Sequence, residues 1–193
     1  MKKTLLIGVG VVAAVLFLLI VWFASQYNRL VALQEDVHSA WSQVETVLQR
    51  RYDLIPNLVN TVKGYAKHEK DVFEDVTRLR SQWAGAGTVD EKVKAAGRME
   101  GGLARLLVVA ERYPELKANK NFQDLQYELA GTENRIAVER QRYNDAVRIY
   151  HTSARQFPGS IVAGMFGFSA DAVYFEAKGE AKEAPKVDFG TEK

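Results

Sequence analysis

The chain has 193 residues, enough for one membrane-spanning helix and one soluble domain with its own hydrophobic core. Its 26 Lys and Arg residues nearly balance its 24 Asp and Glu residues, and the net charge of only +2 argues against a general nucleic-acid-binding protein. The sequence contains no cysteine, which excludes disulfides and thiolate metal ligands.

The first predicted element is an apolar segment, residues 5–24, which follows a short flank at residues 1–4. Residues 5–23 carry no charge, no proline and no polar side chain. A helix of this length spans about 28 Å, close to the ~30 Å hydrocarbon core of a bilayer. The alternative is a cleaved signal peptide. However, the run is longer than a signal core, and Trp22 occupies a position where a cleavage site needs a small residue. We therefore predict an uncleaved, single transmembrane anchor.

Basic residues flank this anchor mainly on its N-terminal side. Lys2 and Lys3 precede it, whereas only Arg29 follows closely, before Glu35 and Asp36. The positive-inside rule then places the N-terminus in the cytoplasm and the main domain on the periplasmic, or extracytoplasmic, side of the membrane.

Residues 25–156 show helical periodicity and form the predicted bundle domain. Up to residue 55, apolar residues recur every three or four positions, and Leu30, Trp41 and Tyr52 stand 11 residues apart. This period is typical of a straight or slightly right-handed helix. Because no Gly or Pro separates this helix from the anchor, we expect the two to be continuous.

Two prolines interrupt the helical pattern, and the glycine-containing run from Trp83 to Asp90 indicates a turn. If that turn is the tip of an antiparallel hairpin, Pro56 and Pro114 lie at one level. A mild kink there gives a long bent hairpin, whereas a full reversal gives an up-down-up-down four-helix bundle. The sequence leaves both open, and both are all-α folds.

The second half of the chain shows two more helices. The first has Thr88 or Asp90 as its N-cap, and we expect its glycines to permit close helix packing rather than to form a ligand loop: Gly97, Gly101 and Gly102. The last long helix ends before Phe157-Pro158-Gly159.

An apolar, aromatic segment, residues 157–176, follows the last helix. It is too short and irregular to span a membrane and returns to membrane level at the base of the bundle. Three locations stay open: the headgroup zone of the membrane, the base of the bundle, or a neighbouring copy. The tail, residues 177–193, mixes Lys and Glu with few apolar residues, and we predict that it is disordered.

No motif in the chain indicates catalysis, a metal or a cofactor. His68-Glu69 begins like a zinc-binding helix motif, but Val72 stands where the second histidine is required. There is no Gly-x-Ser-x-Gly motif and no phosphate-binding glycine-rich loop. We therefore expect a protein that is not an enzyme and that has no cofactor.

Charged residues near the helix interruptions are the remaining candidates for a polar site. A four-helix bundle would bring Arg51 or Asp53 near Glu111 or Glu133, and Arg140 lies on the same last helix as Glu133. The first interpretation is that these residues form helix-end ion pairs that set the register of the bundle. The second is a buried polar cluster that serves as a switch or a binding site.

Several of these residues lie in motifs that resemble the bacterial LemA family. The first motif is Arg51-Tyr-Asp-Leu-Ile-Pro-Asn-Leu-Val59, followed by Glu69. Further matching motifs lie between Tyr27 and Glu176: Glu111-Arg-Tyr-Pro-Glu-Leu-Lys117, Thr132-Glu-Asn-Arg-Ile136, Arg140, Tyr143, Asn144, Phe157-Pro158, Phe166-Gly-Phe168 and Tyr174-Phe-Glu176.

The resemblance implies a membrane-anchored protein with long antiparallel helices and no established catalytic residues. It also implies a role in membrane organisation, because the family includes proteins of magnetosome membranes. Descriptions of the family often place the short N-terminus outside the cell, whereas the charges that flank the anchor in this chain favour the opposite orientation.

These observations predict a scaffold of the bacterial inner membrane that self-associates through its helical domain and its membrane-proximal segment. Its expected partners are membrane lipid and further copies of the chain. The alternative is a sensor or adaptor that presents the bundle to an envelope protein, such as a protease or a signalling kinase. The candidate structural and interaction residues are Arg51, Asp53, Pro56, Asn57, Glu69, Glu111, Pro114, Glu133, Arg140, Asn144, Phe166, Phe168, Tyr174 and Phe175.

Overall fold

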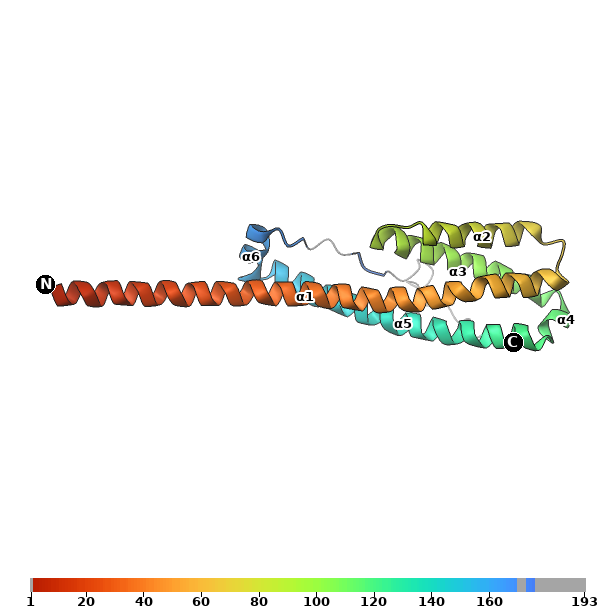
Figure 1. Ribbon diagram of the computed structural model, residues 1–193, viewed down its shortest axis with the longest axis horizontal. Helices are drawn as coiled ribbons and strands as arrows, with labels where there is room; N and C mark the ends of the chain where they lie inside the picture. The colour runs from red at the N-terminus through yellow and green to blue at the C-terminus, as the bar shows by residue number, and fades with distance from the viewer. Residues whose placement is uncertain (1, 170–172, 176–193) are drawn as a thin grey trace, which may run out of the picture.

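The computed structural model describes residues 2–169 and 173–175. The described residues form helices and no strand, which confirms the all-α prediction (Figure 1). The tail at residues 177–193, for which we predicted disorder, lies outside the described residues. In chain order the helices are α1 (Lys2–Tyr65), α2 (Lys70–Ala84), α3 (Val89–Glu111), α4 (Pro114–Lys117), α5 (Lys120–Arg155) and α6 (Gly159–Phe166).

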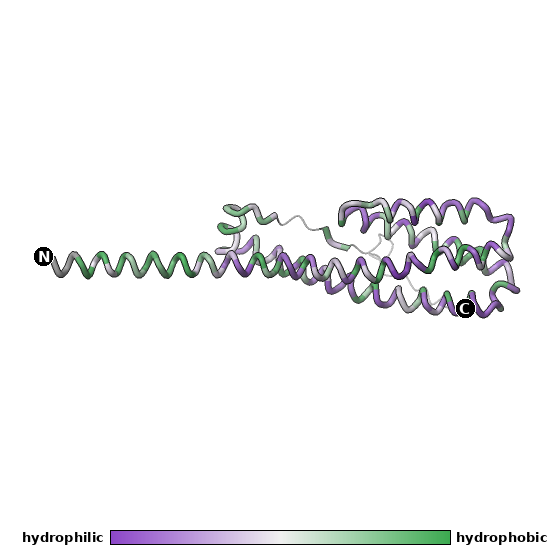
Figure 2. The backbone as a smooth tube through the Cα atoms, viewed as in Figure 1, coloured by the Kyte–Doolittle hydropathy of each residue, from purple (hydrophilic) through white to green (hydrophobic). Residues whose placement is uncertain are grey.

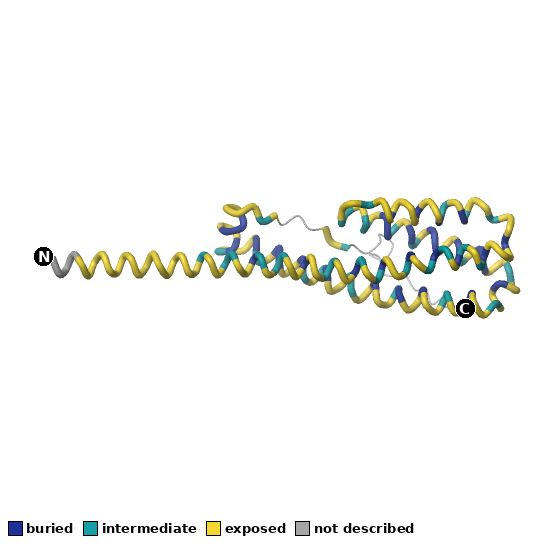
Figure 3. Tube along the Cα trace, in the orientation of Figure 1, coloured by how far each residue is buried: buried dark blue, intermediate teal, exposed yellow. Residues whose placement is uncertain are grey.

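Helix α1 is continuous from the anchor to the distal end of the bundle (Figure 1). At ~1.5 Å per residue it is about 95 Å long. The large apolar side chains from Leu6 to Trp22 are 42–70% exposed, whereas Leu30 is only 2% exposed. Figures 2 and 3 show the same change along α1, from an apolar, exposed rod to a helix buried along one side. The expected continuity of anchor and bundle helix is thus confirmed.

Pro56 lies inside α1 and does not reverse the chain. Because proline lacks an N–H group, the carbonyl of Tyr52 loses its partner within the helix. The Nε of Arg80 in α2 donates a hydrogen bond to that carbonyl at 3.4 Å. A reversal at Pro56 is therefore wrong. The chain turns instead at residues 66–69, and α2 begins at Lys70.

The helices form two antiparallel pairs, α1 with α5 and α2 with α3 (Figure 1). The α2–α3 hairpin covers only the distal part of the α1–α5 pair, whereas α6 packs against α1 and α5 near the anchor (Figure 1). Pro114 begins the short helix α4, which joins α3 to α5 at the same distal end as the 66–69 turn. The four-helix alternative is correct, with its first reversal later in the chain than Pro56.

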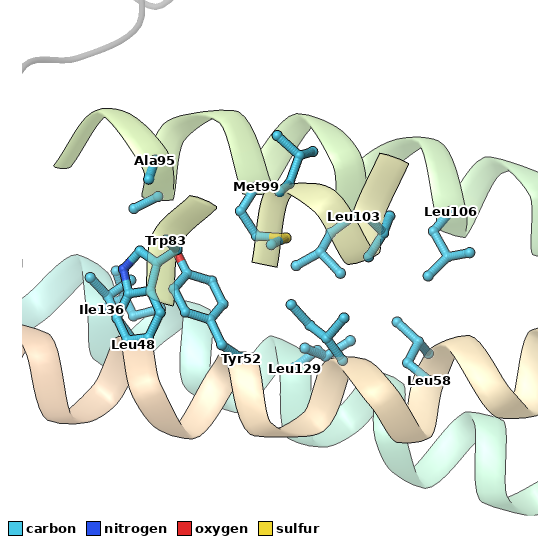
Figure 4. Close-up of a cluster of buried hydrophobic side chains, with 14 of the residues drawn as sticks. Leu48, Tyr52, Leu58, Trp83, Ala95, Met99, Leu103, Leu106, Leu129 and Ile136 are labelled. Carbon is cyan, nitrogen blue, oxygen red and sulfur yellow. The ribbon is translucent and has the colours of Figure 1, made fainter. Parts of the chain in front are cut away.

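The hydrophobic core lies where the two pairs meet (Figure 4). The rings of Tyr52 on α1 and Trp83 on α2 meet edge to face, with their centroids 4.3 Å apart. The labelled neighbours come from α1, α3 and α5 and are all buried: Leu48, Leu58, Ala95, Met99, Leu103, Leu106, Leu129 and Ile136. This cluster holds the α2–α3 hairpin on the α1–α5 pair.

The tip of the hairpin is stabilised by a capping box at the start of α3. The hydroxyl of Thr88 accepts the backbone N–H of Glu91 at 3.2 Å, so Thr88 is the N-cap. The Glu91 carboxylate accepts the N–H groups of Gly87 (2.9 Å) and Thr88 (3.1 Å). These backbone hydrogen bonds lower the pKa of Glu91. Of the two N-caps considered, Thr88 is the one that the structure shows.

Close helix packing requires glycine at only one of the three glycine positions in α3. A Cβ atom at Gly102 would lie 2.7 Å from a methyl carbon of Leu79 in α2. At Gly97 and Gly101, a Cβ atom would meet no atom of the described residues within 4 Å, the helix's own nearby backbone aside. The packing interpretation is confirmed for Gly102 and is wrong for the other two.

We expect G101A to raise the free energy of unfolding by up to about 1 kcal/mol, because alanine favours a helix over glycine and this position is exposed. We expect G102A to be less stable than G101A by about 1 kcal/mol, because its methyl group displaces Leu79. Urea unfolding of the full-length protein in detergent measures both. Equal stabilisation by the two substitutions would contradict the close contact at Gly102.

Candidate functional site

The chain beyond α6 returns to the bundle as a short segment, residues 173–175, here called the strap. The ring of Phe175 stacks on Trp41 of α1, with centroids 6.0 Å apart and an interplanar angle of 21°. Tyr143 of α5 meets the same ring edge to face at 5.7 Å. The guanidinium of Arg140 lies 4.9 Å from the ring centroid. Phe175 therefore occupies an aromatic site between the two longest helices.

A single side chain, Asn144, recognises the backbone of the strap. Its Oδ1 accepts the N–H of Phe175 at 2.9 Å, and its Nδ2 donates to the carbonyl of Phe175 at 2.9 Å. The hydroxyl of Tyr174 lies 3.3 Å from Nδ1 of His151. Asn144 thus satisfies both backbone groups of one strap residue, as a neighbouring strand does in a sheet.

A second aromatic group lies at the base of the bundle, beside the end of the anchor. The ring of Phe166 at the end of α6 is 4.8 Å from that of Tyr27 and 6.2 Å from that of Phe23. The ring of Phe168 lies 5.5 Å from that of Tyr27. The structure thus places Phe166 and Phe168 at the base, whereas Tyr174 and Phe175 lie further along the bundle.

A cluster of four charged side chains lies between α1, α3 and α5. Arg51 forms an ion pair with Glu133, and Arg140 forms one with Glu100 at 2.7 Å. Burial lowers the pKa of Arg51, and the negative charge of Glu100 opposes this effect. Two positive and two negative groups therefore compensate one another at the helix interface, and Arg140 also joins this cluster to the strap through Phe175.

The other sequence candidates lie outside the charge cluster and the strap. Three of them flank the distal turns: Glu69 pairs with Arg112 at 3.4 Å, Glu111 pairs with Lys117 at 2.5 Å, and Pro114 begins α4. On α1, Asp53 accepts a hydrogen bond from Gln49 at 2.7 Å, and Asn57 is exposed. These contacts stay near the helix ends or within one helix.

Sequence reasoning missed Glu100, and it treated Trp41 only as part of an apolar stripe. A local signal for Glu100 was present, because it stands four residues after Ala96 and three before Leu103, on the buried side of α3. For Trp41 there was none, because its partner Phe175 lies at the other end of the chain.

The described residues contain no group of three or more His, Asp or Glu side chains that could hold a metal ion. A cavity of ≈ 410 Å³ lies beside the strap, and Trp41, Tyr143 and Val173 are among its lining residues. The lining combines the aromatic side chains of Trp41 and Tyr143 with polar side chains, among them His38, Ser42 and Asp90. Such groups are suited to holding a peptide segment.

The described residues contain one helix that is long and apolar enough to cross a membrane, near the N-terminus. The fold therefore defines a class: an all-helical bundle carried on a membrane anchor. The LemA family model matches residues 40–189, and the chain belongs to the LemA family. This confirms the resemblance seen in the sequence motifs. The match continues past Glu176, into residues where the sequence showed no family motif.

Two kinds of relatives match most of the chain. Magnetosome protein MamQ 2 of Paramagnetospirillum magneticum is 27% identical over 79% of this chain and 65% of its own length. Magnetosome protein MamQ of Magnetospirillum gryphiswaldense is 25% identical over 90% of this chain and 72% of its own length. Protein LemA of Metamycoplasma hominis is 22% identical over 88% of this chain and 75% of its own length. These similarities fit a membrane protein.

Proposed function

We propose that this protein is a non-enzymatic, single-pass scaffold of the bacterial inner membrane whose copies associate side by side. The observation that carries the proposal is the unbroken helix α1, which runs from the anchor to the distal end of the bundle. Because no hinge separates anchor and bundle, the anchor sets the height of every part of the bundle above the membrane. Copies in one membrane then present the same surface at the same level.

Membrane lipid is the first partner in this proposal, since it surrounds the exposed apolar side chains from Leu6 to Trp22. Lys2 and Lys3 favour an N-terminus in the cytoplasm and a bundle on the extracytoplasmic side. The relatives named magnetosome proteins support a role in organising a membrane structure.

The outer face of α5 offers a surface for a second copy. Tyr127, Val138 and Ile149 are 76%, 48% and 44% exposed. They stand 11 residues apart, a spacing that covers three full turns and places them in one line along the helix. A second copy, held upright by its own anchor, would bury the same line of side chains.

The absence of cysteine allows a direct test of this surface. We expect V138C to form disulfide-linked dimers on oxidation in native membranes, several-fold more than V108C. Val108 is a matched control, because it is also apolar and 58% exposed but lies on α3. Equal cross-linking of the two variants, together with a single-copy elution profile in mild detergent at all concentrations, would contradict self-association.

One observation favours the alternative, an adaptor for a protein partner. The cavity beside the strap extends to the start of α3, where Thr88, Val89 and Asp90 line it. An extended segment of a partner would enter it next to Phe175. Copurification of an envelope protein with a chain that elutes as a single copy would favour the adaptor over the scaffold.

A further inference from the structure

Helix α6 has one buried face and one exposed apolar face. Gly159, Val162 and Ala163 are buried and pack towards α1 and α5. The opposite side of α6 carries Ile161 (49% exposed) and Met165 (67%), about one helical turn apart, and Phe157 (77%) is exposed in the turn that precedes α6. Residues 157–169 contain no charged side chain.

The position of α6 is set by a close approach to the end of α5. A Cβ atom at Gly159 would lie 2.1 Å from the carbonyl oxygen of Ser153, so only glycine fits there. The helix that follows lies beside α1 at the end of the anchor (Figure 1). Val162 and Ala163 belong to a small hydrophobic cluster with Leu30, against which Phe23 and Tyr27 pack.

An apolar notch opens between α6 and the anchor itself. It has a volume of ≈ 510 Å³, and its walls include Leu16, Leu19, Ile20, Phe23 and Phe166. Most of these side chains belong to the predicted membrane span, so the notch lies at the depth of lipid acyl chains. Leu16, Leu19 and Ile20 in its wall are 54%, 53% and 67% exposed, so the notch is part of the exposed apolar surface of the anchor.

We propose that α6 is a second membrane contact, which lies in the boundary layer of the bilayer beside the anchor and closes around an acyl chain in the notch. Lipid is the occupant that fits, because the exposed face is apolar, carries no charge to desolvate and continues the surface of the span. This inference rests on the part of the proposed function that places residues 5–24 across a membrane. It does not depend on self-association.

The depth of Met165 tests this contact. In the full-length protein, M165C would carry an environment-sensitive fluorophore, with one copy reconstituted per nanodisc of phosphatidylcholine and phosphatidylglycerol. Nitroxide-labelled phosphatidylcholine in the disc quenches only probes near lipid. L18C, within the span, and Y127C, at a residue that is 76% exposed in the distal part of α5, give the two reference levels.

We expect the lipid-attached nitroxide to quench the probe at M165C several-fold more than the probe at Y127C, approaching the value for L18C. Quenching equal to that of Y127C would overturn the proposal. A probe at M165C whose emission reports an apolar surrounding only in discs with several copies would also overturn the proposal, since the exposed face of α6 would then contact another copy. Failure of V138C cross-linking leaves the expected result unchanged, so the inference and self-association fail separately.

Discussion

Replacing Trp83 with alanine is expected to lower the free energy of unfolding by about 3–5 kcal/mol, the usual loss for a large aromatic side chain in a core. Trp83 is 5% exposed and meets Tyr52 edge to face. It is a large aromatic side chain of α2 that lies between the two helix pairs, beside Leu48 and Ile136 (Figure 4). Its loss therefore removes core volume and weakens the attachment of the α2–α3 hairpin at once.

Two matched variants separate this effect from a general loss of helix stability. W83F retains a ring against Tyr52, and the indole N–H has no hydrogen-bond partner within the described part of the chain, so we expect a loss of only about 1–2 kcal/mol. V108A removes an exposed apolar side chain and should change stability by less than about 0.5 kcal/mol. Urea unfolding followed by far-ultraviolet circular dichroism, in detergent, compares all three. A loss for W83A as small as that for V108A would contradict the contact.

Replacing Glu100 with methionine is expected to lower the free energy of unfolding by about 2–3 kcal/mol. This loss is larger than expected from the change in side-chain volume, because glutamate and methionine are similar in size. The side chains of Glu100 and Arg140 are only 17% and 23% exposed. Without Glu100, the positive charges of Arg51 and Arg140 face each other without this compensation at a partly buried interface. Water compensates Arg140 only in part for the loss of Glu100, because the Arg140 side chain is largely buried and the ring of Phe175 lies against its guanidinium.

The double variant E100M/R140M distinguishes an unpaired charge from lost packing. We expect it to recover at least about half of the loss in E100M, because removing both members of a buried pair is often close to neutral. A double-mutant cycle with the two single variants, measured by urea unfolding, gives the coupling. If the losses in E100M and R140M simply add, the pair does not act as one unit and the prediction fails.

Local signals in the sequence were enough to predict the long helices and several of their ends, but not the short helices α4 and α6 or the turn at residues 66–69. Thr88 caps α3 because its hydroxyl reaches an N–H only three residues away. Phe157-Pro158-Gly159 follows the end of α5, where Arg155 is the last helical residue. The anchor is equally local, since its long uncharged run needs no partner elsewhere in the chain to be recognised.

The location of the first reversal depended on a contact between helices. Pro56 alone indicated a kink or a break, because its missing N–H leaves the carbonyl of Tyr52 without a partner. The structure shows that Arg80, from the next helix, donates to that carbonyl and that α1 continues to Tyr65. The spacing of residues within α1 does not predict that a side chain on α2 lies beside this carbonyl.

The sequence by itself thus predicted the apolar span and the long helices, because periodicity, capping and apolar length act over a few turns of one helix, and its motifs indicated the family. Tertiary structure decided which distant residues meet: Arg51 with Glu133, and Phe175 with Trp41 and Asn144. These pairs join parts of the chain that are brought together only when α5 returns along α1. The candidate site, unlike the fold class, is therefore a property of the packed bundle.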